Sequence, residues 1–341
     1  MLIATSQLSE SNLRGRQALS LVDVCAGGGG LALGLHTAGF QPVLLLDDLE
    51  VASNTLRINQ PDWNVFHGNL LKFDPADHSY TYDASLLSAG LPRVKASATT
   101  ARSRGSDVEL ELLKATVMLV HGIQPKCLLI ENLADLVVKE TYRSIRTFIE
   151  EELIHLGYRW KWFVLDAADF GVPQERKQGF LIAFKDNVID QFQIPQPAPE
   201  TERMTVGRAL YESMASRGWQ DAATWAAYAD RVAPTLVGGS MDRGGADLGP
   251  SGTKRAWARM GVFGGSLADE TPPEHFRWRP ELGREGMVRL TVPQTAILQG
   301  FPKTWRFAGR KTIQYRQIGQ ATPPPVGKAL GSAIRSALTN Q

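Results

Sequence analysis

Short apolar runs alternate with segments of helical spacing between residues 19 and 184. Leu31, Leu35 and Ala38 recur at helical spacing after the first run, and further helix-like segments occupy Val108–His121 and Tyr142–Leu156. Strands that alternate with helices usually pair in parallel and are covered on both faces. The pattern therefore predicts an α/β fold with a doubly wound, mostly parallel sheet. The expected strands are Leu19–Val24, Val43–Leu46, Ser85–Leu87, Cys127–Ile130, Trp160–Leu165 and Gly179–Phe184.

The alternation stops at the segment Pro-Gln-Pro-Ala-Pro of residues 195–199, which is typical of a linker. Residues 200–290 hold many Gly, Arg and Trp residues without a sustained period. We therefore predict an N-terminal arm over residues 1–18, and residues 200–290 are expected to form a separate, smaller domain.

Composition is ordinary for a soluble globular protein, with 43% hydrophobic and 21% charged residues in a chain of 341. No apolar run approaches the roughly 20 residues of a membrane helix, and no secretory signal is indicated, so no membrane partner is expected. Cys25 and Cys127 fall in expected core strands, which favours a reducing, cytoplasmic setting over a disulfide framework. A net charge of +2 means that a nucleic-acid surface would have to be a local basic cluster.

A run of four glycines follows the first expected strand, and Asp47 ends the second. Glycines there let the backbone approach a ligand and open a helix whose N–H groups bind polar groups. Alone, this signal is shared by many nucleotide-binding folds. Asp47 could instead cap the helix expected at Glu50–Ile58. Its place at the carboxyl end of a strand, where such sheets bind ligands, favours a role in binding a cofactor.

Six blocks of sequence, taken in order, resemble those of the DNA cytosine-5 methyltransferases, and the chain is identified as a member of that family. The resemblance implies a Rossmann-like core that binds S-adenosylmethionine and is built from residues 19–195 and 300–341. It also implies a small target-recognition domain at residues 200–290, inserted between these two parts. Six blocks in the family's order would not arise by coincidence. The blocks are Asp23–Gly30, Ala89–Ser97, Leu128–Leu133, Asp169–Arg176, Leu298–Pro302, and Tyr315–Gly319 followed by Pro323–Pro325.

The resemblance implies a cofactor pocket in which Asp47 holds the ribose hydroxyls of S-adenosyl-L-methionine and Leu49 covers the adenine. Asn69 stands where the family has an aspartate that accepts from the adenine amino group, and Gln320 replaces an asparagine. An amide oxygen still accepts a hydrogen bond, so weakened binding is expected. No metal site is expected. The implied cofactor-binding residues are Cys25, Ala26, Gly27, Gly29, Asp47, Leu49, Asn69, Pro92 and Gln320.

Arg93 occupies the position of the family's nucleophilic cysteine. In the family, a thiolate adds to C6 of cytosine so that C5 can take the methyl group, while a glutamate holds N3 and an arginine holds O2. A guanidinium stays protonated and cannot replace the thiolate. By resemblance, Glu131 is the glutamate and Arg176 is the first arginine of Gln-x-Arg-x-Arg, but Gln178 stands at the second, which the family directs at O2.

Neither cysteine is expected to replace the missing nucleophile. Cys127 lies four residues before Glu131, roughly 13 Å back along an extended strand. Cys25 belongs to the glycine-rich loop. Both are interpreted as buried core thiols.

Basic residues follow Pro92 and recur in the expected small domain. In the family, the first of these segments closes over DNA, where basic side chains would meet phosphates, although a solvated basic loop has the same composition. Residues 234–240 resemble the family's Thr-Leu recognition core. The expected partner is double-stranded DNA. The expected DNA-binding residues are Lys95, Arg102, Arg104, Thr235, Leu236, Arg243, Lys254 and Arg255.

Three functions remain open. The favoured one is a DNA-binding pseudoenzyme or accessory subunit of a DNA methylation or restriction-modification system, because loss of a covalent nucleophile costs several orders of magnitude in rate. The second is an active cytosine-5 methyltransferase that is completed by a partner chain, such as a second methyltransferase subunit, or that uses an atypical mechanism. The third is an enzyme repurposed for another reaction on a nucleobase, with Arg93 as an electrostatic group.

Overall fold

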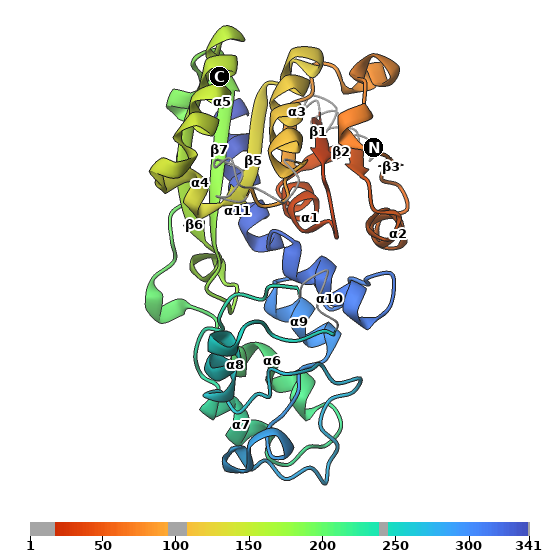
Figure 1. Cartoon of the computed structure of the whole chain (residues 1–341), viewed down its shortest axis with the longest axis vertical. Coiled ribbons are helices and arrows are strands. Elements are labelled where there is room, and N and C mark those ends of the chain that lie inside the picture. Colours follow the sequence, from red (N-terminus) through yellow and green to blue (C-terminus); the bar gives the residue numbers. More distant parts are fainter. Residues whose placement is uncertain (1–17, 95–107, 239–244, 340–341) are drawn as a thin grey trace, which may run out of the picture.

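A seven-stranded sheet forms the centre of the larger lobe in the computed structural model, which describes residues 18–94, 108–238 and 245–339 (Figure 1). The strand order is β3-β2-β1-β4-β5-β7-β6, and only β7 runs antiparallel to its neighbours. The predicted fold class, doubly wound with a mostly parallel sheet, is confirmed. The strands are β1 (Leu19–Val24), β2 (Phe40–Asp47), β3 (Val65–His67), β4 (Leu86–Gly90), β5 (Cys127–Leu133), β6 (Tyr158–Asp166) and β7 (Lys177–Lys185).

Helices cover both faces of this sheet because successive residues of its strands point to opposite sides. On β1, Val22 packs in a cluster with α3 and α5, whereas Leu21 packs with α1 and α11. Figure 1 shows α3 and α5 on the near side of the sheet. The helices of this lobe are α1 (Gly30–Thr37), α2 (Glu50–Asn59), α3 (Val108–Ile123), α4 (Ala134–Val138), α5 (Arg143–His155) and α11 (Pro324–Thr339).

The strand order reverses at β1. From β1 the chain moves outward to β2 and β3, and it then returns to β4 on the other side of β1. Connections that leave β1 and β4 in opposite directions open a crevice at the carboxyl ends of these strands, where α/β sheets bind ligands. Both the glycine-rich loop after β1 and the segment after β4 reach this crevice.

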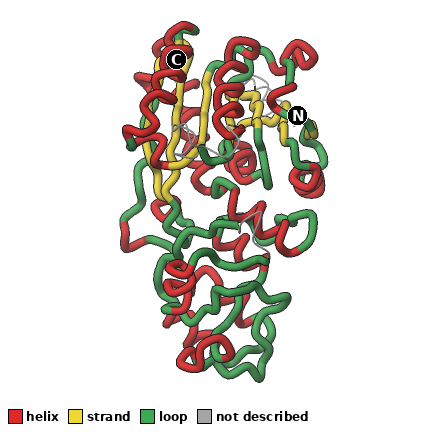
Figure 2. Tube along the Cα trace, viewed as in Figure 1, coloured by secondary structure: helices red, strands yellow, loops and turns green. Residues whose placement is uncertain are grey.

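The smaller lobe consists mainly of loops and short helices (Figure 2). Trp225 and Trp257 are fully buried in its core, and this core continues into Tyr315 and Ile318 of α10. The hydrophobic cluster therefore spans the boundary that the sequence places between residues 290 and 300, and the division into domains stays a prediction. The helices here are α6 (Val206–Ala215), α7 (Ala222–Tyr228), α8 (Ser251–Ala258), α9 (Val292–Leu298) and α10 (Lys311–Gln320).

The predicted arm of residues 1–18 lies outside the described residues apart from Ala18. Among the described helices, none combines the length and the apolar character that crossing a membrane requires.

Candidate active site

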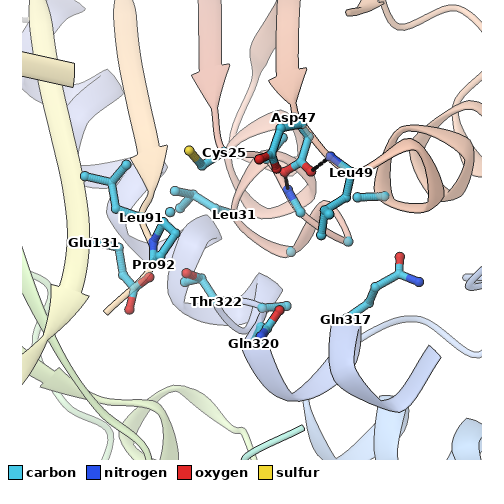
Figure 3. Close-up of a pocket in the computed structure, with 18 of the residues that line it drawn as sticks. Cys25, Leu31, Asp47, Leu49, Leu91, Pro92, Glu131, Gln317, Gln320 and Thr322 are labelled. Atoms are coloured by element: carbon cyan, nitrogen blue, oxygen red, sulfur yellow. Dashed lines mark hydrogen bonds between the residues drawn. The ribbon is translucent and has the colours of Figure 1, made fainter. Parts of the chain in front are cut away.

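A cavity of about 570 Å³ lies at the carboxyl ends of β1, β2, β4 and β5. Asp47 and Leu49 line one side, and Pro92 and Glu131 line the opposite side (Figure 3). Gln320, the last residue of α10 (Lys311–Gln320), and Thr322, which follows that helix, lie between these two sides. The crevice expected from the strand order is therefore a cavity with polar groups at both ends.

The glycine-rich loop forms the floor of this cavity. Cys25, Ala26 and Gly27, which the sequence suggests as cofactor-binding residues, line it. Gly27 adopts φ +55° and has open space where a side chain would be, so its backbone can approach a ligand. At Gly30, a Cβ atom would lie 2.1 Å from the carbonyl oxygen of Thr322, so only glycine permits this contact with the C-terminal segment.

Gly29 is a correction to the predicted pocket. It is absent from the cavity lining, and a Cβ atom on it would meet the side chains of Leu56 and Trp305. Its φ of +84° marks the N-cap of α1. Gly29 is therefore needed for the turn and for close packing, and it does not contact a ligand in the cavity.

Asp47 is held by the loop that it faces. The backbone N–H of Gly27 donates to Asp47 Oδ2 (2.7 Å), and that of Leu49 donates to Oδ1 (2.9 Å) (Figure 3). Burial raises the pKa of Asp47, and the two N–H donors oppose this rise. The alternative role as a helix cap is wrong, because Leu49 is the N-cap of α2 and no side chain caps that helix.

The remaining predicted cofactor residues divide into two groups. Leu49, Pro92 and Gln320 line the cavity. Asn69 does not: its side chain is exposed, and its Oδ1 accepts from the N–H of Leu71 (2.8 Å). The Asn69 amide caps the following 3-10 turn, and the structure does not place it in the cavity lining where the adenine contact was predicted.

Sequence reasoning missed Asp23, which also lines the cavity. The Ser88 hydroxyl donates to Asp23 Oδ1, and Oδ2 has no hydrogen-bond partner among the described residues. Burial raises the pKa of Asp23 to about 7; the Ser88 hydrogen bond lowers it and the nearby Asp47 raises it further. The signal was a carboxylate among the buried apolar residues Leu21, Val22 and Val24 of β1.

Glu131 lies in the buried part of β5, two residues before its end, and is only 6% exposed. Gln178 Nε2 donates to Glu131 Oε1 (2.7 Å), because β5 and β7 pair antiparallel and bring these two positions together. Burial raises the pKa of Glu131, while the Gln178 hydrogen bond and the charges of Arg176 and Arg93 lower it. The sequence shows that glutamine replaces the family's arginine at position 178, but it did not predict that the Gln178 amide would bind Glu131.

Arg176 contacts the smaller lobe. Its guanidinium is 1% exposed, and Nη1 donates to the carbonyl oxygen of Leu236 (3.0 Å). Burial, followed by the charge of Arg93, lowers the pKa of Arg176 to about 10. The N–H of Leu236 in turn donates to Gln174 Oε1 (2.7 Å), and the Thr235 hydroxyl donates to the carbonyl of Glu175 (2.6 Å). This segment therefore joins the two lobes.

Leu236 is a second correction, because its side chain is 0% exposed and cannot contact DNA. The Thr235 hydroxyl is already bonded to the backbone. On α8, Lys254 Nζ lies 2.8 Å from Asp247 Oδ2 in an ion pair, while Arg255 is exposed. Four other predicted DNA-binding residues lie outside the described residues: Lys95, Arg102, Arg104 and Arg243.

Arg93 lies in a short loop that Asn132 anchors. Asn132 Nδ2 donates to the carbonyl of Pro92 (3.1 Å), and the N–H of Val94 donates to Asn132 Oδ1 (3.2 Å). Arg93 itself is exposed to solvent and lines the cavity together with Glu131. The loop thus fixes the backbone of Arg93 at the base of the cavity and leaves its guanidinium near Glu131 and Arg176.

Both cysteines of the chain are free thiols. Burial raises the pKa of Cys127, and that of Cys25 is raised by burial and by the carboxylates of Asp47, Asp48 and Asp23. A nucleophilic cysteine needs a lowered pKa, so neither thiol has the required environment.

Comparison with known proteins agrees with this geometry. Residues 19–336 match the model of the C-5 cytosine-specific DNA methylases. The chain is 38% identical to the type II methyltransferase M.NaeI of Lentzea aerocolonigenes over 94% of this chain and 76% of that protein. It is 36% identical to M.NgoMIV of Neisseria gonorrhoeae, over 94% and 98%. The fold resembles that of the S. pombe Dnmt2 methyltransferase, with a TM-score of 0.65, 16% identity and coverage of 95% and 100%. The chain belongs to the C-5 cytosine-specific DNA methylase family.

Proposed function

We propose that this chain is a DNA-binding member of the C-5 cytosine-specific DNA methylase family that transfers no methyl group on its own. It would act as an accessory subunit of a DNA methylation or restriction-modification system. The observation that carries the proposal is Arg93, which lines the cavity with Glu131 and occupies the position of the family's nucleophilic cysteine.

The cavity supports binding of the family's cofactor. Methyltransferases of this family use S-adenosyl-L-methionine, which supplies an electrophilic methyl group. A volume of about 570 Å³ is in the usual range for small-molecule sites. Asp47 retains lone pairs for ribose hydroxyls after accepting from Gly27 and Leu49. Binding would be weak because Asn69 offers no contact from within the cavity.

The chemistry of the base end supports the absence of methyl transfer. Carbon-5 of cytosine becomes nucleophilic only after a group adds to C6. Arg93 has no lone pair for that bond, and burial keeps the thiols of Cys25 and Cys127 protonated. Gln178 brings no positive charge to O2, and its amide is bonded to Glu131. Glu131 lines the cavity and would still offer carboxylate lone pairs to a base.

The wild-type chain alone is expected to transfer no detectable methyl group from labelled S-adenosylmethionine to duplex DNA. It should also form no covalent adduct with DNA that contains 5-fluorocytosine, because such an adduct requires a nucleophile bonded to C6. Scintillation counting of the DNA and denaturing electrophoresis measure the two results. Labelled 5-methylcytosine formed by the purified chain would refute the proposal. Label that appears only with a second methyltransferase subunit would support the accessory role.

DNA binding is proposed for the smaller lobe, residues 200–290, on the resemblance of that segment to a target-recognition domain. Arg255 on α8 is exposed and therefore available to a phosphate. Lys254 is partly engaged by Asp247, so it would contribute less. Leu236, by contrast, is buried in the hydrophobic core of this lobe and would stabilise its fold.

Substituting Arg255→Gln is expected to weaken binding of all duplex sequences and to reduce the slope of log K against log salt by about one, since one phosphate contact is lost. Fluorescence anisotropy at several salt concentrations measures both effects. Arg143→Gln is the matched control: Arg143 is exposed, ion-paired with Glu140 and placed on α5 of the larger lobe. Equal salt slopes for wild type and Arg255→Gln would remove Arg255 from the interface.

A further inference from the structure

We infer that Arg93 makes the cofactor cavity prefer the uncharged thioether S-adenosylhomocysteine to the cationic sulfonium of S-adenosylmethionine. This inference rests on the proposed cofactor binding and adds a ligand preference to it. The two ligands share every hydrogen-bonding group, and they differ only in one methyl group and in the positive charge at sulfur.

The arrangement of the cavity brings the sulfur end of such a ligand toward Arg93. Asp47 and Leu49 lie on one side of the cavity, and Pro92 and Glu131 lie on the other (Figure 3). A ligand whose ribose is held by Asp47 has the rest of the cavity, toward Pro92, for its sulfur and amino-acid part. Arg93 follows Pro92 directly and lines the same cavity.

The charge of Arg93 acts on the interior of the cavity even though the side chain is exposed to solvent. Burial raises the pKa of Glu131 most, and Arg93 is among the neighbours that lower it. Burial and then Arg93 lower the pKa of Arg176. Both responses indicate a guanidinium close enough to stabilise a negative charge and to destabilise a positive one at this end of the cavity.

The carboxyl groups around the cavity favour a cationic ligand, and the charge of Arg93 opposes them. Burial raises the pKa of Asp23 to about 7, so this group is partly protonated near neutral pH, and burial also raises the pKa of Asp47 and of Glu131. A guanidinium stays charged throughout that range. Asp48 and Glu109 also line the cavity, but their charge is the same in the wild type and in variants of Arg93. The effect of Arg93 can therefore be isolated by substitution.

Calorimetric titration of the full chain with each ligand tests the inference through the ratio of the two dissociation constants. Arg93→Gln is expected to shift this ratio about tenfold in favour of S-adenosylmethionine, as expected for the loss of one charge repulsion at an intermediate dielectric. Arg93→Lys should keep the wild-type ratio because it keeps the charge. Arg143→Gln, which removes an exposed arginine of α5 outside the cavity, should also keep it.

A nitrogen analogue of S-adenosylhomocysteine, with a protonated secondary amine in place of the sulfur, carries the positive charge without the methyl group and so separates charge from bulk. It should follow S-adenosylmethionine across all variants. A ratio that is equal in wild type and Arg93→Gln would overturn the inference and leave cofactor binding intact. If the folded wild type and Arg93→Gln bind neither ligand, the proposed cofactor binding fails, and this inference fails with it. A changed ratio in Arg93→Lys would also count against a charge effect.

Discussion

The double variant Arg93→Cys with Gln178→Arg is expected to methylate duplex DNA at a rate about a hundredfold above that of Arg93→Cys alone, which should itself be barely detectable. The cysteine supplies the bond to C6, and the arginine supplies a cation for the O2 of cytosine. Removing one donor that stabilises developing charge costs an enzyme a factor of about 100 to 1,000. Restoring the positive charge at position 178 should therefore raise the rate by about this factor.

The structure explains why Arg176 cannot take this role. Its Nη1 donates to the carbonyl of Leu236, which ties the guanidinium to the smaller lobe. Gln178 instead faces Glu131 at 2.7 Å, so an arginine at that position could keep a bond to Glu131 while it offers a charge to a base. Arg176 would stay in its present contacts.

Labelled methyl transfer to duplex DNA, measured at saturating S-adenosylmethionine, compares the variants directly. The matched control is Arg93→Cys with Gln196→Arg, which makes the same chemical change at an exposed glutamine outside the cavity. That control should be no faster than Arg93→Cys. Equal rates for the two double variants would mean that Gln178 does not limit the reaction.

The strong hydrophobic pattern made the fold predictable. Leu19–Val24 was expected as a strand and is β1 with the same bounds, because its residues are mostly apolar and a run of glycines follows them. β3, with residues Val65–His67, was missed since it is short and mostly exposed, so no apolar run marks it. The antiparallel direction of β7 was also beyond prediction, because periodicity reports burial and not strand direction.

Site residues were predictable where the backbone of a motif determines their position. Asp47 ends β2 and Glu131 lies near the carboxyl end of β5, and these strand ends meet at one edge of the sheet, so the cavity contains both. Gly29, Asn69 and Leu236 were assigned from resemblance alone, and their side chains or Cβ directions lead elsewhere. Motif position gives the place of a residue in the chain, but it does not give the direction in which its side chain points.

The hydrogen-bond partners of the buried polar side chains were the least predictable feature of the site. The Gln178–Glu131 hydrogen bond joins residues 47 positions apart, and it depends on the register between β5 and β7. The Asp23–Ser88 pair likewise joins neighbouring strands β1 and β4. Such pairs follow from strand order and register, which the spacing of residues within one motif does not contain.

Asp47→Ala is expected to weaken the binding of S-adenosylhomocysteine about a hundredfold. The carboxylate would accept from two ribose hydroxyls, and loss of these charge-assisted hydrogen bonds costs about 3 kcal/mol, which corresponds to about two powers of ten. The same substitution removes the acceptors of the Gly27 and Leu49 N–H groups, which loosens the loop under the ligand. Calorimetric titration measures the affinity.

Thermal unfolding of the same proteins separates a binding role from a structural one. The N–H groups that Asp47 leaves can turn to water in the open cavity, so the variant should remain folded with a modestly lower melting temperature. Asp62→Ala, which removes an exposed carboxylate outside the cavity, should change neither property. Asp47→Asn should fall between wild type and Asp47→Ala, because an amide keeps one acceptor but turns an NH₂ donor toward an N–H group of the loop. Unchanged affinity in a folded Asp47→Ala protein would place the ribose elsewhere. In that event, the sulfur end of the ligand would no longer be directed toward Arg93 by this anchor.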